Sequence, residues 1–222
     1  MSTAVIIVAA GRGHRMGGET PKQYLPLDAH CALRHSVQAF LDRPQVTQLC
    51  TVIHPDDAGL YANALNGLTD PRITPPAHGG ATRAASVLSG LNALHPHAPQ
   101  HVLIHDAARP FVTATIIDAV CEGLNETEGC CAALPVIDAL WSSDGTTAKT
   151  PIPRDGLWRA QTPQGFHFAK LHAAHLAHDG TGADDVAVAR EAGLQVRFVQ
   201  GSDENYKITT PQDLARARNT LN

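Results

Sequence analysis

Short apolar runs alternate with segments of helical periodicity through the first third of the chain. The runs at 5–8 and 49–53 are rich in Val and Ile, which predicts strands buried on both faces. Apolar residues at helical spacing over 33–41 predict a helix between them. A shorter helical stretch ends near Leu65, and 72–74 predicts a third, short strand. This βαβαβ order predicts a parallel sheet that binds ligands at the carboxyl ends of its strands.

The same alternation continues toward the C-terminus, with one interruption. We expect a strand ending at Asp106, a helix over 115–124, strands over 131–136 and 194–199, two helices between these strands, and a closing helix from Pro211. The pattern lapses over 137–157, where prolines and glycines accumulate, and excursions of this length usually serve function or association. The sequence therefore predicts one α/β domain over 1–222, with a mostly parallel twisted sheet flanked by helices and a protruding arm at about 137–157.

Composition narrows the classes of function and the compartment. The 222 residues have a formal net charge of −4 and a pI near 6.3, so binding along a nucleic acid has no electrostatic support. Five cysteines without a C-x-x-C motif argue against a disulfide framework or a zinc site, and for a reducing, cytoplasmic compartment. The N-terminal apolar run is short and has no basic residues before it. We therefore expect no signal peptide and no membrane span. The length suits one domain, so we also expect no further domain after the last helix.

The first predicted strand leads directly into a glycine-rich, basic loop. Glycines let backbone N–H groups approach a ligand, and basic side chains place positive charge where a polyphosphate would lie. The residues of this kind are Gly11, Arg12, Gly13, Arg15, Gly17, Gly18 and Lys22. A P-loop needs Gly-Lys-Ser/Thr, which this loop lacks. A Rossmann fingerprint needs more closely spaced glycines that lead into a helix, and Pro21 interrupts any early helix here. Neither motif therefore fits. The loop predicts an anion site of another type, and a solvated loop after a core strand is the alternative.

A second glycine pair precedes a predicted helix. Gly79 and Gly80 lead into a segment whose first turns carry Arg83 and Ser86. The free N–H groups of a helix N-terminus attract phosphate or sugar oxygens, so this segment is a candidate nucleotide site. The alternative is a glycine-capped helix with Arg83 in solvent.

Asp106 is the candidate metal ligand. A buried strand presents its carboxylate at the carboxyl edge of the sheet, where α/β proteins bind ligands. Magnesium is often held by one or two carboxylates together with substrate phosphates and water, so one aspartate suffices if a nucleotide triphosphate is present. The alternative is an ion pair with Arg109 at the strand end.

Several strings resemble one family in the order in which they occur. AAGRGHRMG at 9–17 and PKQY at 21–24 resemble the signature loop of the sugar-phosphate nucleotidyltransferases, and within them that of the 2-C-methyl-D-erythritol 4-phosphate cytidylyltransferases. Further strings that resemble this family are GGATRAASV at 79–87, DAARP at 106–110, QTPQGF at 161–166 and NYKIT at 205–209. The matched strings extend over nearly the whole chain.

The resemblance implies a Rossmann-like nucleotidyltransferase domain that transfers CMP from CTP to 2-C-methyl-D-erythritol 4-phosphate in the non-mevalonate isoprenoid pathway. It also implies Mg²⁺ or another divalent cation, and a homodimer in which Arg154 of the arm reaches the sugar phosphate bound by the second subunit. The implied residues are Arg15 and Lys22 for catalysis; Ala9, Ala10, Gly11, Gly13, Gly79, Gly80, Arg83 and Ser86 for the nucleotide; Arg109, Arg154 and Lys207 for the acceptor substrate; and Asp106 for the metal.

The chain departs from the family pattern in two places. The usual D-T-x-K of the arm reads DALW at 138–141, and Ala81 stands where the family often has an acidic residue. A cytidylyltransferase for ribitol 5-phosphate or another polyol phosphate therefore stays open. A non-catalytic nucleotide-binding module is the alternative from another class, and the joint presence of Arg15, Lys22 and Asp106 argues against it.

Three histidines follow at intervals of three residues. His172, His175 and His178 drift around a helix at this spacing, whereas a zinc site needs a tighter cluster with a further ligand. The pattern therefore predicts a solvated helix face.

Overall fold

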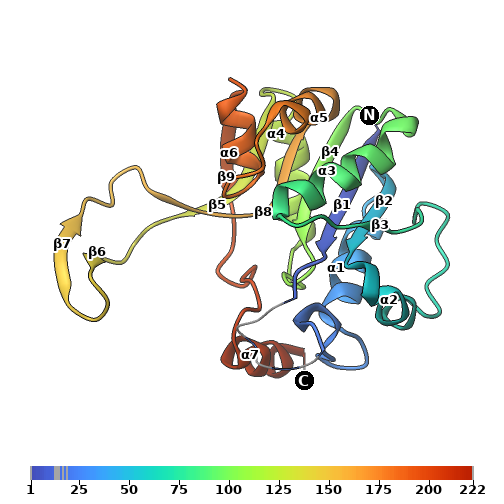
Figure 1. Cartoon of the computed structure of the whole chain (residues 1–222), viewed down its shortest axis with the longest axis horizontal. Coiled ribbons are helices and arrows are strands. Elements are labelled where there is room, and N and C mark those ends of the chain that lie inside the picture. The colour runs from blue at the N-terminus through green and yellow to red at the C-terminus, as the bar shows by residue number, and fades with distance from the viewer. Residues whose placement is uncertain (1, 13–15, 17, 19, 222) are drawn as a thin grey trace.

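The computed structural model describes residues 2–12, 16, 18 and 20–221. Within these residues, seven strands form one sheet in the order β3-β2-β1-β4-β8-β5-β9 (Figure 1). The strands are β1 (Thr3–Ala9), β2 (Val46–Ile53), β3 (Ala77–His78), β4 (His101–Asp106), β5 (Gly129–Pro135), β8 (Trp158–His167) and β9 (Val196–Gln200). β1 pairs in parallel with β2 and β4, β2 pairs in parallel with β3, β8 runs antiparallel to both of its neighbours, and β9 is parallel to β5. The mostly parallel α/β sheet is confirmed.

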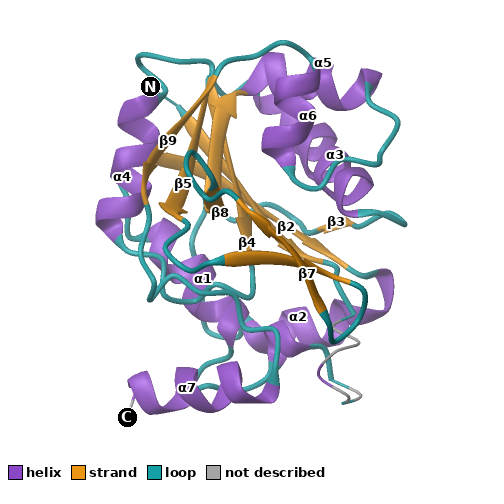
Figure 2. Cartoon of the chain, turned by 90° about the vertical axis from the view of Figure 1, so that its left-hand side faces the viewer, coloured by secondary structure: helices purple, strands orange, loops and turns teal. Residues whose placement is uncertain are grey.

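Helices cover both faces of the sheet (Figure 2). They are α1 (Ala32–Leu41), α2 (Ala58–Ala64), α3 (Arg83–Leu94), α4 (Ala114–Gly123), α5 (Phe168–Ala177), α6 (Asp185–Glu191) and α7 (Pro211–Leu221). Successive residues of β1 point to opposite faces. Val5 and Ile7 therefore pack in the core with α1 and α4, and Ala4 and Ile6 pack with α3, α5 and α6. The burial of β1 on both faces, expected from its apolar run, is confirmed.

The segment expected as an excursion leaves the sheet as an arm. The chain exits from β5, forms the antiparallel hairpin of β6 (Leu140–Ser143) and β7 (Ala148–Ile152), and returns as β8. Figure 1 shows this arm extending far from the sheet and the helices. The arm leaves the sheet at the end of β5 and rejoins it at the start of β8, and these two points, the roots of the arm, are neighbours because β5 and β8 pair with each other.

Two features of the sheet differ from the prediction. The third strand is Ala77–His78 and not 72–74, although Ile73 forms an isolated parallel bridge with Leu49. Pro75 and Pro76 separate the two segments, and proline lacks the N–H that a continuous ladder requires. The central strand β8 was not predicted, because its buried half contains polar residues and Pro163 in place of an alternating or apolar pattern.

Candidate active site

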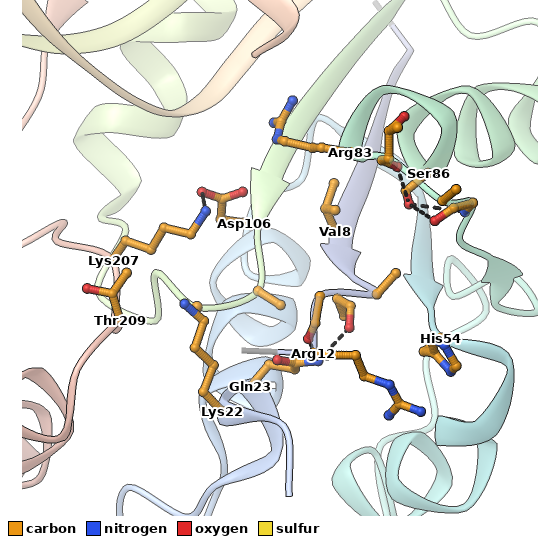
Figure 3. A pocket seen from close by; sticks show the side chains of 18 residues that line it. Val8, Arg12, Lys22, Gln23, His54, Arg83, Ser86, Asp106, Lys207 and Thr209 are labelled. Atoms are coloured by element: carbon orange, nitrogen blue, oxygen red, sulfur yellow. Dashed lines mark hydrogen bonds and ion pairs between the residues drawn. The ribbon is translucent and has the colours of Figure 1, made fainter. Parts of the chain in front are cut away.

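The carboxyl ends of β1, β2 and β4 meet at one edge of the sheet and form a cleft with the start of α3 (Figure 3). The volume of this cleft is about 610 Å³. Its lining consists of Val8, Ala9, Ala10, Gly11, Arg12, Lys22, Gln23, His54, Gly80, Ala81, Thr82, Arg83, Ser86, Asp106, Ala107, Ala108, Lys207 and Thr209. The glycine loop, the second glycine segment and the aspartate predicted from sequence therefore line one cavity. This is the ligand position that the parallel strand order predicts.

Gln23 holds the glycine loop at the mouth of the cleft. Its buried side-chain amide donates hydrogen bonds to the carbonyl oxygens of Ala9 (2.5 Å) and Gly11 (3.1 Å). It lies in the short helical turn η2 (Lys22–Tyr24), whose first residue, Lys22, lines the cleft. Gln23 could not be predicted from local sequence, because its role depends on carbonyl groups more than ten residues earlier. Gly13 and Arg15, also predicted for this loop, lie outside the described residues.

Arg12 is tied to the segment that follows β2. Its guanidinium forms ion pairs with Asp57 (2.7 Å) and Asp56 (3.1 Å), and the Asp57 side chain is almost completely buried. Because these carboxylates already face Arg12, the residue links the loop after β1 to the loop after β2. In the sequence, Arg12 stands out only as part of a basic cluster.

Hydrogen bonds of Ser86 hold together the second glycine segment, which leads from Gly79 into α3. The Ser86 hydroxyl accepts a hydrogen bond from the Gly80 N–H (3.1 Å) and donates one to the Thr82 carbonyl oxygen (2.9 Å). The Thr82 hydroxyl in turn caps α3 by accepting from the Ala85 N–H (3.1 Å). A Cβ atom on Gly80 would lie 2.6 Å from that of Ala85, so glycine is required there by packing. Gly79 does not line the cleft.

Asp106 is held as an anion by nearby cations. Its carboxylate lies 2.9 Å from Lys207 Nζ and 3.5 Å from Arg109 Nε, and Figure 3 shows Lys207 and Asp106 directed at each other. Burial alone would raise the pKa of Asp106, but Lys207, Arg83 and Arg109 together hold it well below its ordinary value. The carboxylate is therefore ionised at neutral pH. The predicted Asp106–Arg109 contact exists, and Lys207 makes the shorter one.

A chain of hydrogen bonds fixes the backbone under Asp106. The Asp106 N–H donates to the Thr162 hydroxyl (3.1 Å), which lies 3.0 Å from His105 Nδ1. His105 Nε2 lies 3.0 Å from the Arg109 carbonyl oxygen, an obligate acceptor, so Nε2 carries the proton and Nδ1 accepts from Thr162. His105 is completely buried, and burial lowers its pKa to about 4. A neutral imidazole thus supports the strand end that presents Asp106.

The donor set fits a cation that brings part of its own ligand shell. Among the described residues, no group of three or more His, Cys, Asp or Glu is placed to hold a metal ion. Asp106 is the one acidic residue in the lining of the cleft as described, and it is ionised. One hard carboxylate oxygen beside an open cleft suits Mg²⁺ completed by phosphate oxygens and water.

Comparison with known proteins gives the family. A family model for 2-C-methyl-D-erythritol 4-phosphate cytidylyltransferase matches residues 3–222. The chain is 46% identical over 221 residues to the 2-C-methyl-D-erythritol 4-phosphate cytidylyltransferase of Cereibacter sphaeroides (strain KD131), covering 100% of this chain and 97% of that protein. The chain belongs to this family. It is also 48% identical over 218 residues to the bifunctional enzyme IspD/IspF of Paramagnetospirillum magneticum, covering 97% of this chain and 56% of that enzyme.

Solved structures agree with membership in the cytidylyltransferase family. A crystal structure of 4-diphosphocytidyl-2C-methyl-D-erythritol synthase superposes with a TM-score of 0.85 at 29% identity, covering 100% of this chain and 99% of the other. The 2-C-methyl-D-erythritol 4-phosphate cytidylyltransferase from Thermus thermophilus gives a TM-score of 0.79 at 30% identity, with coverage of 99% and 98%. The chain is therefore a nucleotidyltransferase, and the non-catalytic alternative is not supported.

Two predicted acceptor residues of this cytidylyltransferase lie outside the lining of the cleft. Arg109 is mostly buried, and its Nη1 donates to the Asn205 carbonyl oxygen (2.7 Å), which connects the end of β4 to the segment carrying Lys207. Arg154 lies on the exposed arm and donates to the Ile137 carbonyl oxygen. Their roles in acceptor binding stay predictions.

The interpretation of the three histidines as a solvated face is wrong for two of them. His175 is buried and forms a hydrogen bond with Asp185 (3.1 Å), and the His178 side chain, only 6% exposed, lies 3.0 Å from Glu191. Their carboxylate partners come from α6, which the spacing within one helix could not reveal. None of the helices in the described residues is long and apolar enough to cross a membrane.

Proposed function

We propose that this chain transfers CMP from CTP to 2-C-methyl-D-erythritol 4-phosphate and releases pyrophosphate. The observation that carries the proposal is the convergence of Lys22, Asp106 and Lys207 on one cleft beside the glycine loop. Carbonyl and N–H groups of the loops after β1 and before α3 suit a nucleotide, and the cations suit its phosphates. The family of the chain supports the same reaction.

The acceptor phosphate would attack the α-phosphorus of CTP in line. A phosphate monoester has a second pKa of about 6, so the attacking group is already largely a dianion near neutrality and needs no general base. What the protein supplies is orientation and positive charge against a crowded, highly anionic transition state. We assign this role to Lys22 and Arg15.

Asp106 would hold the divalent cation, which supplies charge neutralisation on the phosphate oxygens when bound. With Asp106 so engaged, the ammonium of Lys207, now 2.9 Å from that carboxylate, would be directed at the acceptor phosphate instead. Arg109 would keep the Lys207 segment in place through its hydrogen bond to Asn205. The same site thus contains one group for the metal and one for the acceptor.

We also propose that two copies of the chain associate through the arm. An isolated two-stranded hairpin is marginally stable in water, yet the arm that carries this one exposes Ile137 (66%), Trp141 (56%) and Ile152 (44%). Cover by a second copy would stabilise the arm and bring Arg154 to the neighbouring cleft. We place the enzyme in the cytoplasm, because every cysteine is a free thiol.

The test is pyrophosphate release by the purified protein with Mg²⁺. CTP, UTP and ATP are compared as donors, and 2-C-methyl-D-erythritol 4-phosphate and ribitol 5-phosphate as acceptors. Turnover confined to CTP and the methylerythritol phosphate is expected, and it would make Ala139 and Trp141 tolerated changes in the arm. Turnover only with the ribitol phosphate would instead refute the proposed acceptor, and absence of turnover with every pair would refute the proposed reaction.

A further inference from the structure

Arg83 occupies an electrostatically unfavourable position. It is the first residue of α3, and no acidic residue lies in the first turn of that helix. The N-terminus of a helix carries partial positive charge, so a cation there is destabilising unless an anion compensates it. Arg83 also lines the cleft, and its side chain is 26% exposed. The cleft thus contains a concentrated positive charge that suits an anionic ligand and needs a counter-charge in the protein.

The counter-charge comes from a buried carboxylate on another helix. Asp185, the first residue of α6, has no exposed surface and lies 2.7 Å from Arg83 Nη1. Its other carboxylate oxygen lies 3.1 Å from His175 Nε2, which donates because an ionised carboxylate can only accept. Burial alone would raise the pKa of Asp185, but Arg83 and His175 lower it. Both oxygens of a fully buried anion are therefore assigned to a specific partner.

The sheet itself sets the position of Asp185. Gln164 of β8 accepts hydrogen bonds from the N–H groups of Asp185 (3.1 Å) and Val186 (3.2 Å), and its amide donates to Asp184 (2.9 Å). β8 lies between β4 and β5, so the start of α6 is fixed to the centre of the fold. Asp185 is consequently a rigid anchor for the longer, more mobile side chain of Arg83.

A second carboxylate competes for the same arginine. Burial alone would lower the pKa of Arg83, but Asp185 and then Asp106 raise it, so both acids act on this guanidinium. The ion pairs that Asp106 makes are with Lys207 and Arg109, and the ion pair of Arg83 is with Asp185. Without Asp185, Arg83 would be drawn toward Asp106. Asp185 therefore keeps Arg83 at the start of α3 and leaves the Asp106 carboxylate to Lys207 and Arg109.

We propose that Asp185, supported by His175, is a positioning residue for nucleotide binding: it holds the guanidinium of Arg83 where the nucleotide enters the cleft. This inference rests on the proposed function, because it takes the ligand of Arg83 to be CTP. Neither Asp185 nor His175 lines the cleft, so both act through Arg83 and not by touching the substrate.

The experiment is a double-mutant cycle with Asp185→Asn and Arg83→Ala. The wild type is measured first for turnover with CTP and 2-C-methyl-D-erythritol 4-phosphate, so that failure of the proposed reaction is seen independently. Asp185→Asn is expected to raise the KM for CTP about tenfold and to change kcat less than about twofold. Calorimetric titration of CTP onto each variant should show the same loss of affinity. In the Arg83→Ala background, Asp185→Asn should leave the KM for CTP unchanged.

Thermal unfolding supplies a readout that separates positioning from folding. Arg83→Ala leaves a buried carboxylate without its cation, so adding Asp185→Asn should raise the Tm of that variant. Asp118→Asn is the matched control, because Asp118 of α4 forms an ion pair with Arg43 (2.6 Å) and neither residue lines the cleft. It should lower Tm and leave the KM for CTP unchanged.

The inference is overturned if Asp185→Asn changes the KM for CTP equally in both backgrounds, or does not change it at all. Should Asp185→Asn fail to fold, His175→Ala replaces it, with His178→Ala as its control, since His178 pairs with Glu191 instead. His175→Ala is then expected to raise the KM for CTP about threefold only when Arg83 is present. An equal effect in the Arg83→Ala background would reject the role of Asp185.

Discussion

Lowering the pH from about 7 to about 5 is expected to destabilise the fold through His105. This histidine is completely buried on β4, and its ring lies edge-on to Phe40 at 4.9 Å between centroids. Its Nδ1 accepts from the Thr162 hydroxyl, which itself accepts from the Asp106 N–H. A proton on Nδ1 would turn this acceptor into a donor and leave the Thr162 hydroxyl without its acceptor.

The magnitude follows from the two pKa values of His105. The ordinary pKa of a histidine side chain is 6.5, and in the folded protein burial lowers the pKa of His105 to about 4 because it disfavours the charged ring. Above a pH of about 6.5 neither state binds the proton, so no stability is lost. As the pH falls from about 6.5 toward about 4, the unfolded chain binds a proton that the folded protein does not, which costs about 1.4 kcal/mol per pH unit. The free energy of unfolding should therefore fall by about 2 kcal/mol at pH 5 and by about 3 kcal/mol at the limit below pH 4.

The assay is urea unfolding of the wild type and of His105→Gln at several pH values in this window. Gln cannot titrate, so the variant, although less stable at neutral pH, should lose less free energy of unfolding on acidification, and the difference between the two curves isolates His105. Ile104→Val is a control from the same strand, because it weakens the packing of β4 but removes no titratable group, so its curve should stay parallel to that of the wild type. Parallel curves for the wild type and His105→Gln would refute the reasoning, since the acid sensitivity would then come from other groups.

Three further predictions concern catalysis. Lys22→Ala should lower kcat by far more than it raises the KM for CTP, because its charge acts on the transition state; single-turnover kinetics with an unchanged kcat would remove Lys22 from this role. Lys207→Ala should mainly raise the KM for the acceptor, as steady-state kinetics would measure, whereas a change confined to the CTP parameters would contradict the assignment. Arg154→Ala should mainly raise the KM for the acceptor, so at an acceptor concentration too low for its turnover, mixing it with Lys22→Ala should restore about a quarter of the wild-type activity, because half of the dimers are hybrids with one intact site each. Full activity of Arg154→Ala, or a monomer by sedimentation with full activity, would exclude a shared site.

The backbone features of the site could be predicted because they depend on local sequence. The run of β1 into Gly11, and the position of Asp106 at the end of a buried strand, follow from apolar runs and glycine content. Their meeting in one cleft follows from the parallel order of β1 and β4, which brings both carboxyl ends to one edge. General rules of topology therefore placed these residues together.

The side-chain partners could not be predicted because they join distant segments. Gln23 bonds to carbonyl oxygens of the preceding loop, and Arg12 pairs with acids more than forty residues later. The spacing of His175 predicts a solvated helix face, whereas in the structure His175 forms a hydrogen bond with Asp185 of a separate helix. Periodicity describes which face of one element is apolar, whereas these contacts depend on how two elements are packed.

The strand β8, which was not predicted, is largely buried although its sequence is polar. Gln161, Thr162 and Gln164 are buried in the middle of the sheet, where an apolar run would be expected. Each has a specific partner: Gln161 bonds to the Ser202 carbonyl oxygen, Thr162 to the Asp106 N–H, and Gln164 to the start of α6. These partners satisfy the polar groups, so the cost of burying them is offset, but only the folded chain provides them.

The return path of the arm gives β8 a double role. Its first three residues, from Trp158 to Ala160, belong to the exposed root of the arm, and only four positions separate Trp158 from Thr162, the support of Asp106. No loop intervenes between these two parts of β8, so the exposed root of the arm and the buried support of the Asp106 backbone belong to one continuous strand. The place where the arm departs from the sheet and the placement of Asp106 are thus set by the same ten residues.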